Sequence, residues 1–147
     1  MTPSAKLDAY LRQNGLKLTK QRQLILDKFV SFDRHVTPDE MLALLKGDMP
    51  NLGLATLYRT MKLFVKAGIA HERRFADGLM RYEYAVEGEH HDHIICTDCG
   101  LIIEFEDDTI EERQREVSRR HGILIQSHRL DIYGTCIDVK NCQRRRK

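Results

Sequence analysis

The sequence predicts an α/β protein made of two small domains, and three observations support this prediction. Its 147 residues are 41% hydrophobic and 31% charged, a balance typical of a folded globular chain. Residues 1–85 carry 14 Lys and Arg against 9 Asp and Glu, whereas residues 86–147 carry 10 against 13. All four cysteines and five of the seven histidines lie after residue 85. We therefore expect residues 1–85 to bind a polyanion and residues 86–147 to bind cations.

Helix signals fill the first part of the N-terminal domain. Residues 7–14 form a short amphipathic pattern that ends at Gly15. Thr19 precedes a second helical pattern, which runs to Val30 and places Leu24 among its inward residues.

The third helix start is the strongest in the chain. Thr37 is a favoured cap, Pro38 occupies the first helical position, and Glu40 stands where it can close a capping box. The apolar stripe that follows includes Leu44. A helix is therefore expected from Pro38 onward.

A basic helix and a basic hairpin complete the N-terminal domain. Residues 54–67 predict a fourth helix, and residues 69–75 and 79–85 alternate on either side of an Asp77-Gly78 turn. This order is that of a winged helix-turn-helix, with the fourth helix in the major groove and the hairpin near the DNA backbone. A solvated basic face is the alternative interpretation of the charges. Candidate DNA contacts are Lys17, Thr56, Arg59, Arg73 and Arg74.

The cysteines of the C-terminal domain form two pairs. Cys96 and Cys99 are separated by two residues and followed by Gly100, the tight turn that lets two thiolates face one tetrahedral ion. Cys136 and Cys142 could complete a structural zinc site of four thiolates. The alternative is a two-cysteine knuckle beside two unrelated buried thiols.

A run of ligand-type residues precedes Cys96. Residues 90–93 read His-His-Asp-His and lead into Ile94 and Ile95, which indicates a strand. Alternate residues of a strand face opposite sides, so His91 and His93 point one way while His90 and Asp92 point the other. One short strand could therefore serve two separate metal sites.

Further candidate ligands for the two faces of this strand occur later in the sequence. Residues 101–105 predict a returning strand that carries Glu104, and a helix starting at Asp107 or Asp108 carries Glu111 in its first turn. Residues 123–133 predict a further strand, whose alternation places His128 on an inward apolar face. On that pattern alone, His128 is either a core histidine or a ligand.

The stretch HHDHIICTDCGLIIEFEDDTIEERQREVSRRHGI closely resembles the ferric uptake regulator family, as do GLKLTKQR, ATLYRTM and RYEY in the N-terminal domain. The resemblance implies a winged-helix domain joined to an α/β dimerisation domain, in a homodimer that represses transcription when a divalent metal binds. It implies that Lys17, Tyr58 and Arg59 touch DNA.

Three metal sites are implied by the same resemblance. The sensing site between the domains would be formed by His35, Glu83, His91, His93 and Glu104. The second site would be formed by His90, Asp92, Glu111 and His128, and the structural zinc site by Cys96, Cys99, Cys136 and Cys142. The chain departs from close relatives by one extra residue between Glu83 and His91 and by a longer gap between Cys136 and Cys142.

The expected cofactors are structural Zn²⁺ and regulatory Fe²⁺, for which Mn²⁺, Co²⁺ or Zn²⁺ could substitute. Glutamate at positions 83 and 104 resembles the iron-responsive branch, whereas peroxide sensors place aspartates there; zinc and manganese sensors remain alternatives. The expected partners are operator DNA and a second copy of the chain, with no small-molecule substrate.

No catalytic residue is assigned. A zinc hydrolase or deaminase would need an open metal position, and the sequence has neither HExxH nor the deaminase pattern. A zinc-ribbon adaptor is the other rival, but it would not need a capped recognition helix and wing. The lack of a signal-peptide core and of an 18-residue apolar run favours a cytoplasmic protein without membrane contact.

Overall fold

The computed structural model describes residues 1–32, 35–85, 91–138, 140 and 142. It is a mixed structure of helices and strands that divides into two compact units, Met1–Glu87 and Gly88–Lys147. Among the described residues, no helix is both long and apolar enough to cross a membrane.

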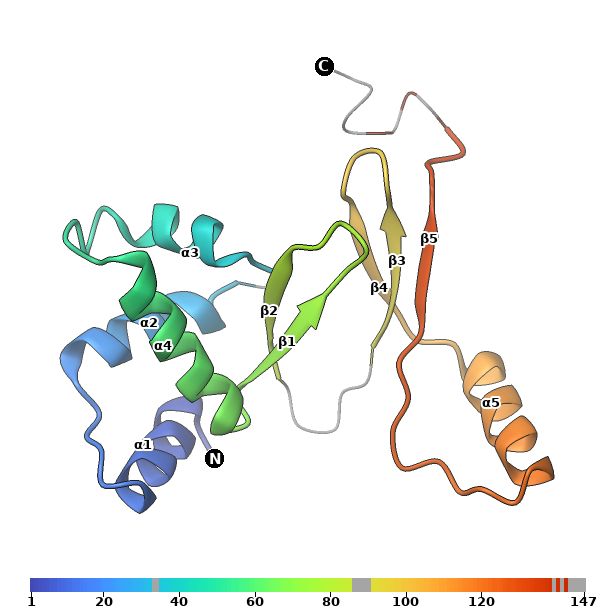
Figure 1. Ribbon diagram of the computed structural model, residues 1–147, viewed down its shortest axis with the longest axis horizontal. Coiled ribbons are helices and arrows are strands. Elements are labelled where there is room, and N and C mark those ends of the chain that lie inside the picture. Colours follow the sequence, from blue (N-terminus) through green and yellow to red (C-terminus); the bar gives the residue numbers. More distant parts are fainter. Residues whose placement is uncertain (33–34, 86–90, 139, 141, 143–147) are drawn as a thin grey trace. The chain divides into compact units, whose positions relative to one another are not determined.

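The N-terminal unit has four helices followed by a hairpin (Figure 1). Its helices are α1 (Pro3–Gln13), α2 (Lys20–Val30), α3 (Pro38–Leu45) and α4 (Leu54–Lys66). The strands β1 (Ala70–Arg74) and β2 (Met80–Tyr84) pair antiparallel around the Asp77-Gly78 turn, where Gly78 has a φ of 81°. The predicted winged-helix order is therefore confirmed.

Threonine caps set three of these helix starts. Thr19 and Thr37 cap α2 and α3 as predicted, and Thr37 with Glu40 forms the complete capping box. The first helix extends ahead of the amphipathic pattern of residues 7–14, because Thr2 caps α1 by accepting a hydrogen bond from the Ala5 N–H at 3.1 Å. The helix therefore begins at Pro3, before its apolar stripe.

The core of the N-terminal unit lies between the helices and the hairpin. All four helices supply fully buried apolar side chains, and the hairpin adds Tyr82. Leu24 and Leu44 were expected to face inward but are 38% and 40% exposed. On α2 the buried residues are Ile25, Leu26 and Phe29, and on α3 Leu45 is buried, so at about 100° per residue Leu24 and Leu44 lie at the edge of each buried stripe.

The described part of the C-terminal unit contains one three-stranded sheet and one helix. The central strand β3 (Asp92–Cys96) pairs antiparallel with β4 (Ile102–Phe105) and parallel with β5 (Asp131–Gly134). The helix α5 (Asp108–Arg120) connects β4 to the segment that leads into β5 (Figure 1).

The predicted strand over residues 123–133 was wrong for most of its length. Residues 123–130 form no strand, and β5 begins only at Asp131, opposite His93. A strand needs a neighbour that supplies hydrogen bonds, and β3, the strand that pairs with β5, itself begins at Asp92. His128 therefore lies in an irregular segment and not on an alternating strand.

Candidate metal centres and nucleic-acid surface

Four cysteine sulfurs converge at one end of the C-terminal sheet. Cys96 ends β3, and the turn after it is closed by the Gly100 N–H donating to the Cys96 carbonyl at 2.8 Å, with Gly100 at a φ of 75°. Because β5 runs parallel to β3 with Gly134 opposite Cys96, the chain beyond β5 brings Cys136 and Cys142 to the same end.

The sulfur positions fit a tetrahedral ion. The Cys96 Sγ lies 4.0 Å from the Cys142 Sγ and 3.4 Å from the Cys136 Sγ. The Cys99 Sγ lies 3.9 Å from the Cys136 Sγ. Thiolates at about 2.3 Å from a tetrahedral zinc ion lie about 3.8 Å from one another. The residues present therefore suit zinc, and the longer gap before Cys142 does not prevent its sulfur from joining the group.

The charge distribution among the thiols favours one thiolate. The backbone N–H of Cys99 donates a hydrogen bond to the Cys96 sulfur and is the main cause that lowers the Cys96 pKa to about 6. The Cys136 thiol donates to the same sulfur, which raises the Cys136 pKa to about 12. The thiolate is the form that binds metals, and among these thiols Cys96 is the one whose contacts favour it.

A second group of donors lies on one face of β3. Asp92 is fully buried, and the His128 Nε2 lies 3.7 Å from the Asp92 Oδ1 and 3.2 Å from the Glu111 Oε1. Donors at about 2.1 Å from a tetrahedral ion are about 3.4 Å apart, so this group also fits a divalent metal. His128 thus lies beside two carboxylates and also lines an apolar cavity with Ile123 and Ile125. His90 lies outside the described residues.

The opposite face of β3 carries His91 and His93. The His91 Nε2 lies 3.9 Å from the Glu104 Oε2, and His93 is paired in register with Glu104 on β4. The buried His93 ring places its Nδ1 3.5 Å from the Asp131 Oδ1. The expected alternation thus separates Asp92 from the two histidines. Asp131 was missed in the sequence because its proximity depends on the parallel pairing of β5.

In the N-terminal unit, His35 and Glu83 are brought together by a backbone bridge. Val36 and Tyr82 exchange two hydrogen bonds of 3.0 and 2.8 Å, which places the flanking His35 Nε2 2.8 Å from the Glu83 Oε2. Phe75 packs edge-on against the His35 ring at 5.6 Å. Adjacent ligands of an octahedral ion at about 2.1 Å are about 3 Å apart, so the pair fits two such positions.

Arg73, a candidate DNA contact, is hydrogen-bonded to Glu83 of this pair. Its Nε donates to the Glu83 Oε1 at 3.2 Å. Arg73 pairs with Arg81 in the hairpin register, so Glu83 is its diagonal neighbour on the same face, within reach of a long side chain. The contact could therefore have been predicted from the Asp77-Gly78 turn, because the turn fixes the pairing register of the hairpin.

The remaining DNA candidates lie at the surface of the N-terminal unit. On α4, Tyr58 is 40% exposed, and the exposed Arg59 donates to the half-buried Thr56 hydroxyl at 3.2 Å. The exposed Arg74 donates to the Gly78 carbonyl at 2.7 Å. Lys17, between α1 and α2, is also exposed. The fourth helix and the wing therefore present basic and aromatic side chains to solvent.

Comparison with known proteins identifies the family. The family model of the ferric uptake regulator family matches residues 13–133. The ferric uptake regulation protein of Campylobacter jejuni is 41% identical over 133 residues, which is 89% of this chain and 84% of that protein.

Solved structures agree with the sequence comparison. The ferric uptake regulator of Helicobacter pylori, described as having three functional metal binding sites, superposes with a TM-score of 0.86 at 32% identity, covering 97% of this chain and 95% of that one. The regulator of Francisella tularensis with iron gives 0.76 at 36% identity, covering 84% and 93%. With a match over most of its length, two units of the expected architecture and clustered side chains of metal-binding type, this chain belongs to the ferric uptake regulator family.

Proposed function

We propose that this chain is a DNA-binding repressor of iron-uptake genes that acts when it binds Fe²⁺, and that it is a regulator with no catalytic function. One observation carries the proposal. His35 and Glu83 form a donor pair in the N-terminal unit, and His91, His93 and Glu104 form a donor group in the C-terminal unit. A pair is too few for an ion that takes four to six ligands, so we infer that both groups bind the same ion.

Such an ion would couple metal binding to DNA binding. Ligands from both units hold the metal only in one arrangement of the units, so the metal favours that arrangement over all others. Raising the fraction of molecules in that arrangement from 1% to 99% requires the metal to bind it more tightly than the others by about 5.5 kcal/mol. In a homodimer, a fixed arrangement also fixes the distance between the two α4 helices, and therefore their match to two half-sites of an operator.

We propose iron as the regulatory metal and zinc as the structural one. The thiolate group is soft and closed, which suits zinc, whereas the imidazole and carboxylate donors suit Fe²⁺, Mn²⁺ or Co²⁺. The iron in the Francisella tularensis structure and the names of the relatives support iron. Affinity order alone favours zinc over iron, so metal availability must contribute to selection. Asp92, Glu111 and His128, with His90, would form the second site of the C-terminal unit.

A homodimer is supported by the apolar surface of the C-terminal unit. Ile103, Ile94 and Ile132 are register partners across β4, β3 and β5, and they are 47%, 37% and 43% exposed. α5 has no buried residue. Apolar patches of this kind on a folded chain mark an interaction site, and we infer that a second copy covers this one.

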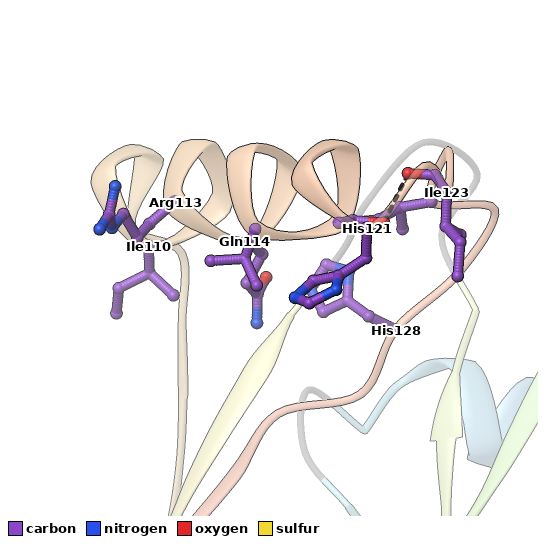
Figure 2. A pocket seen from close by; sticks show the side chains of 9 residues that line it. Ile110, Arg113, Gln114, His121, Ile123 and His128 are labelled. Atoms are coloured by element: carbon purple, nitrogen blue, oxygen red, sulfur yellow. Dashed lines mark hydrogen bonds between the residues drawn. The ribbon is translucent and has the colours of Figure 1, made fainter.

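A cavity beside α5 adds further apolar surface to the C-terminal unit. It has a volume of about 670 Å³ and lies between the helix and the segment that precedes β5. Figure 2 shows Ile110 and Gln114 projecting from one side of α5, with His128 on that side. Val117, Ile123 and Ile125 also line the cavity, and Ile123 is 61% exposed. Side chains of a partner subunit would fill it.

The test compares the two faces of β3. His91→Ala and His93→Ala should abolish metal-activated operator binding while the dimer and its zinc persist, because only the sensing site loses ligands. His90→Ala and Asp92→Ala should mainly destabilise the C-terminal unit and only partly reduce the DNA response. DNA affinity is measured anaerobically with Fe²⁺, Mn²⁺ and Zn²⁺ in parallel, at fixed pH and salt. Identical behaviour of all four variants, or exchanged roles, would contradict the two-site proposal.

A further inference from the structure

The wing hairpin places a permanently charged side chain, Arg73, beside Glu83, the carboxylate of the proposed sensing site. Glu83 uses one oxygen for each of two neighbours: Oε2 lies 2.8 Å from His35, and Oε1 accepts a hydrogen bond from Arg73 at 3.2 Å. The Glu83 side chain is 10% exposed and that of Arg73 is 26% exposed. The guanidinium group stays protonated at every physiological pH, so this partner cannot lose its charge as a histidine can.

The two other arginines of the wing contact other groups. Arg81, on the same face of the hairpin, pairs with Asp77 at 2.7 Å and places its guanidinium 5.5 Å from the Phe75 ring centre. Arg74, the next residue after Arg73, faces the other side and donates to the Gly78 carbonyl. Arg73 is thus distinguished from two arginines of equal charge by its contact with the carboxylate.

We propose that Arg73 is a built-in counter-cation that competes with the regulatory metal for Glu83 and, when the metal binds, becomes available to a DNA phosphate. The inference rests on the proposed function, because it takes Glu83 as a ligand of the regulatory ion. A divalent ion on Glu83 lies within a few ångströms of the guanidinium and repels it, whereas without metal the guanidinium neutralises the carboxylate.

The position of Arg73 explains how release would reach DNA. It lies on β1 of the wing, the element expected beside the DNA backbone, and a partly exposed arginine there needs only to change its rotamer to face solvent. Phosphates accept bidentate hydrogen bonds from guanidinium groups as carboxylates do. The same side chain would therefore weaken metal binding in the free protein and strengthen DNA binding in the metal-loaded one.

The experiment uses the zinc-replete full-length protein, with Mn²⁺ as an air-stable probe. Mn²⁺ affinity is measured without DNA by competition with a fluorescent chelator, for wild type, Arg73→Gln and the matched control Arg74→Gln. Losing a partly exposed, charge-assisted contact should tighten Mn²⁺ binding by roughly three- to tenfold in Arg73→Gln. Arg74→Gln should bind Mn²⁺ as wild type does. Arg73→Lys keeps the charge and should stay within about twofold of wild type, because a lysine can still neutralise Glu83.

A second readout tests the release. At saturating Mn²⁺, the salt dependence of operator binding should be shallower by about one phosphate contact in Arg73→Gln than in wild type. An unchanged slope would overturn the release to DNA. Mn²⁺ binding that is unchanged or weaker in Arg73→Gln would overturn the competition, because Arg73 would then be a neutral or supporting neighbour of the site.

The control for the proposed function is separate. If His93→Ala binds as much Mn²⁺ as wild type does, the proposed sensing site itself is wrong. Unfolding transitions of Arg73→Gln and Arg73→Lys, measured on the same samples, show that both variants are folded. A tighter Mn²⁺ affinity in a folded Arg73→Gln, with wild-type affinity in Arg74→Gln, is the result we expect.

Discussion

The two units of the chain bury very different kinds of side chain. In the N-terminal unit the buried cluster is aliphatic and aromatic, with Phe29, Leu57, Met61 and Phe64 at 1% exposure or less. Among the described residues of the C-terminal unit, the buried side chains are Ile95, two cysteines, Asp92 and His93. Most of these are of metal-binding type, while Leu124 and Ile123 are 80% and 61% exposed.

This difference indicates two different sources of stability. Burial of a large apolar side chain contributes about 1.5–3 kcal/mol, so the N-terminal unit has a conventional hydrophobic core. The C-terminal unit exposes apolar residues and brings together side chains of metal-binding type, so we expect its folded state to depend on bound ions and on a partner that covers its surface. Each of the following changes should therefore affect one unit and leave the other unchanged.

The largest effect is expected from removing zinc. Structural zinc contributes about 10–16 kcal/mol of apparent binding free energy in zinc-finger peptides, comparable to the stability of a domain. Cys96→Ser should lose one zinc per chain, unfold the C-terminal unit and dissociate the dimer, while the helices of the N-terminal unit persist. Zinc content, sedimentation and helical circular dichroism are measured on the same sample. A fully dimeric variant with unchanged zinc would refute the prediction.

A smaller effect, confined to the other unit, is expected from Phe64→Ala. Phe64 is fully buried in α4, with its ring 6.1 Å from that of Phe29, and such a substitution costs about 3–5 kcal/mol. The N-terminal unit should unfold at lower denaturant concentration with zinc content unchanged. Leu44→Ala is the control, because Leu44 is 40% exposed and its loss should cost well under about 1 kcal/mol. Loss of zinc from Phe64→Ala would show that the units do not fold independently.

Local signals in the sequence were sufficient to predict much of this architecture. The Thr37 capping box and the Asp77-Gly78 turn were predicted correctly, because both depend on neighbouring residues only. The alternation of His91, Asp92 and His93 followed from strand geometry in the same way.

Predictions failed where the outcome depends on distant parts of the chain. The strand expected from residue 123 needs a partner that begins only at Asp92, and the exposure of Leu24 depends on which neighbour packs inward. Asp131 beside His93 and Arg73 beside Glu83 both depend on pairing registers. Composition gives no information about these registers, although the hairpin turn, once recognised, fixes one of them.

A modest effect is expected from Thr37→Ala. It removes the hydroxyl that caps α3 and its bond to the Glu40 N–H, which costs about 1 kcal/mol in typical proteins. Denaturant unfolding of the N-terminal unit should report this loss, with dimer and zinc unaffected. Thr2→Ala, a cap near the chain terminus, should cost less because a terminal turn can fray. Equal losses in the two variants would argue against this local origin.

The smallest effect concerns His71 on the wing. Partial desolvation of the His71 ring is the largest cause that lowers its pKa below 6.5; the charges of Arg73 and Lys6 add to it, and Glu83 opposes it. A lowered folded-state pKa means that the contribution of His71 to stability is complete above pH 6.5 and is lost as the pH falls through the folded-state value. Nuclear magnetic resonance titration of the His71 ring should show this, and Arg73→Gln should move the pKa upward. A titration midpoint at or above 6.5 in wild type would contradict the prediction.

The strand β3 has a consequence for how this protein can change over evolutionary time. Its five residues run from Asp92 to Cys96, so one donor for each of the three proposed centres, Asp92, His93 and Cys96, lies within five positions. Insertion or deletion of one residue would turn every donor beyond it to the opposite face relative to the donors before it, and more than one centre would lose a ligand at once. Substitutions at Glu83 and Glu104, which lie on other strands, would alter the donor set one ligand at a time. We therefore expect lineages that acquire a different metal response to change these glutamates while keeping the length of β3.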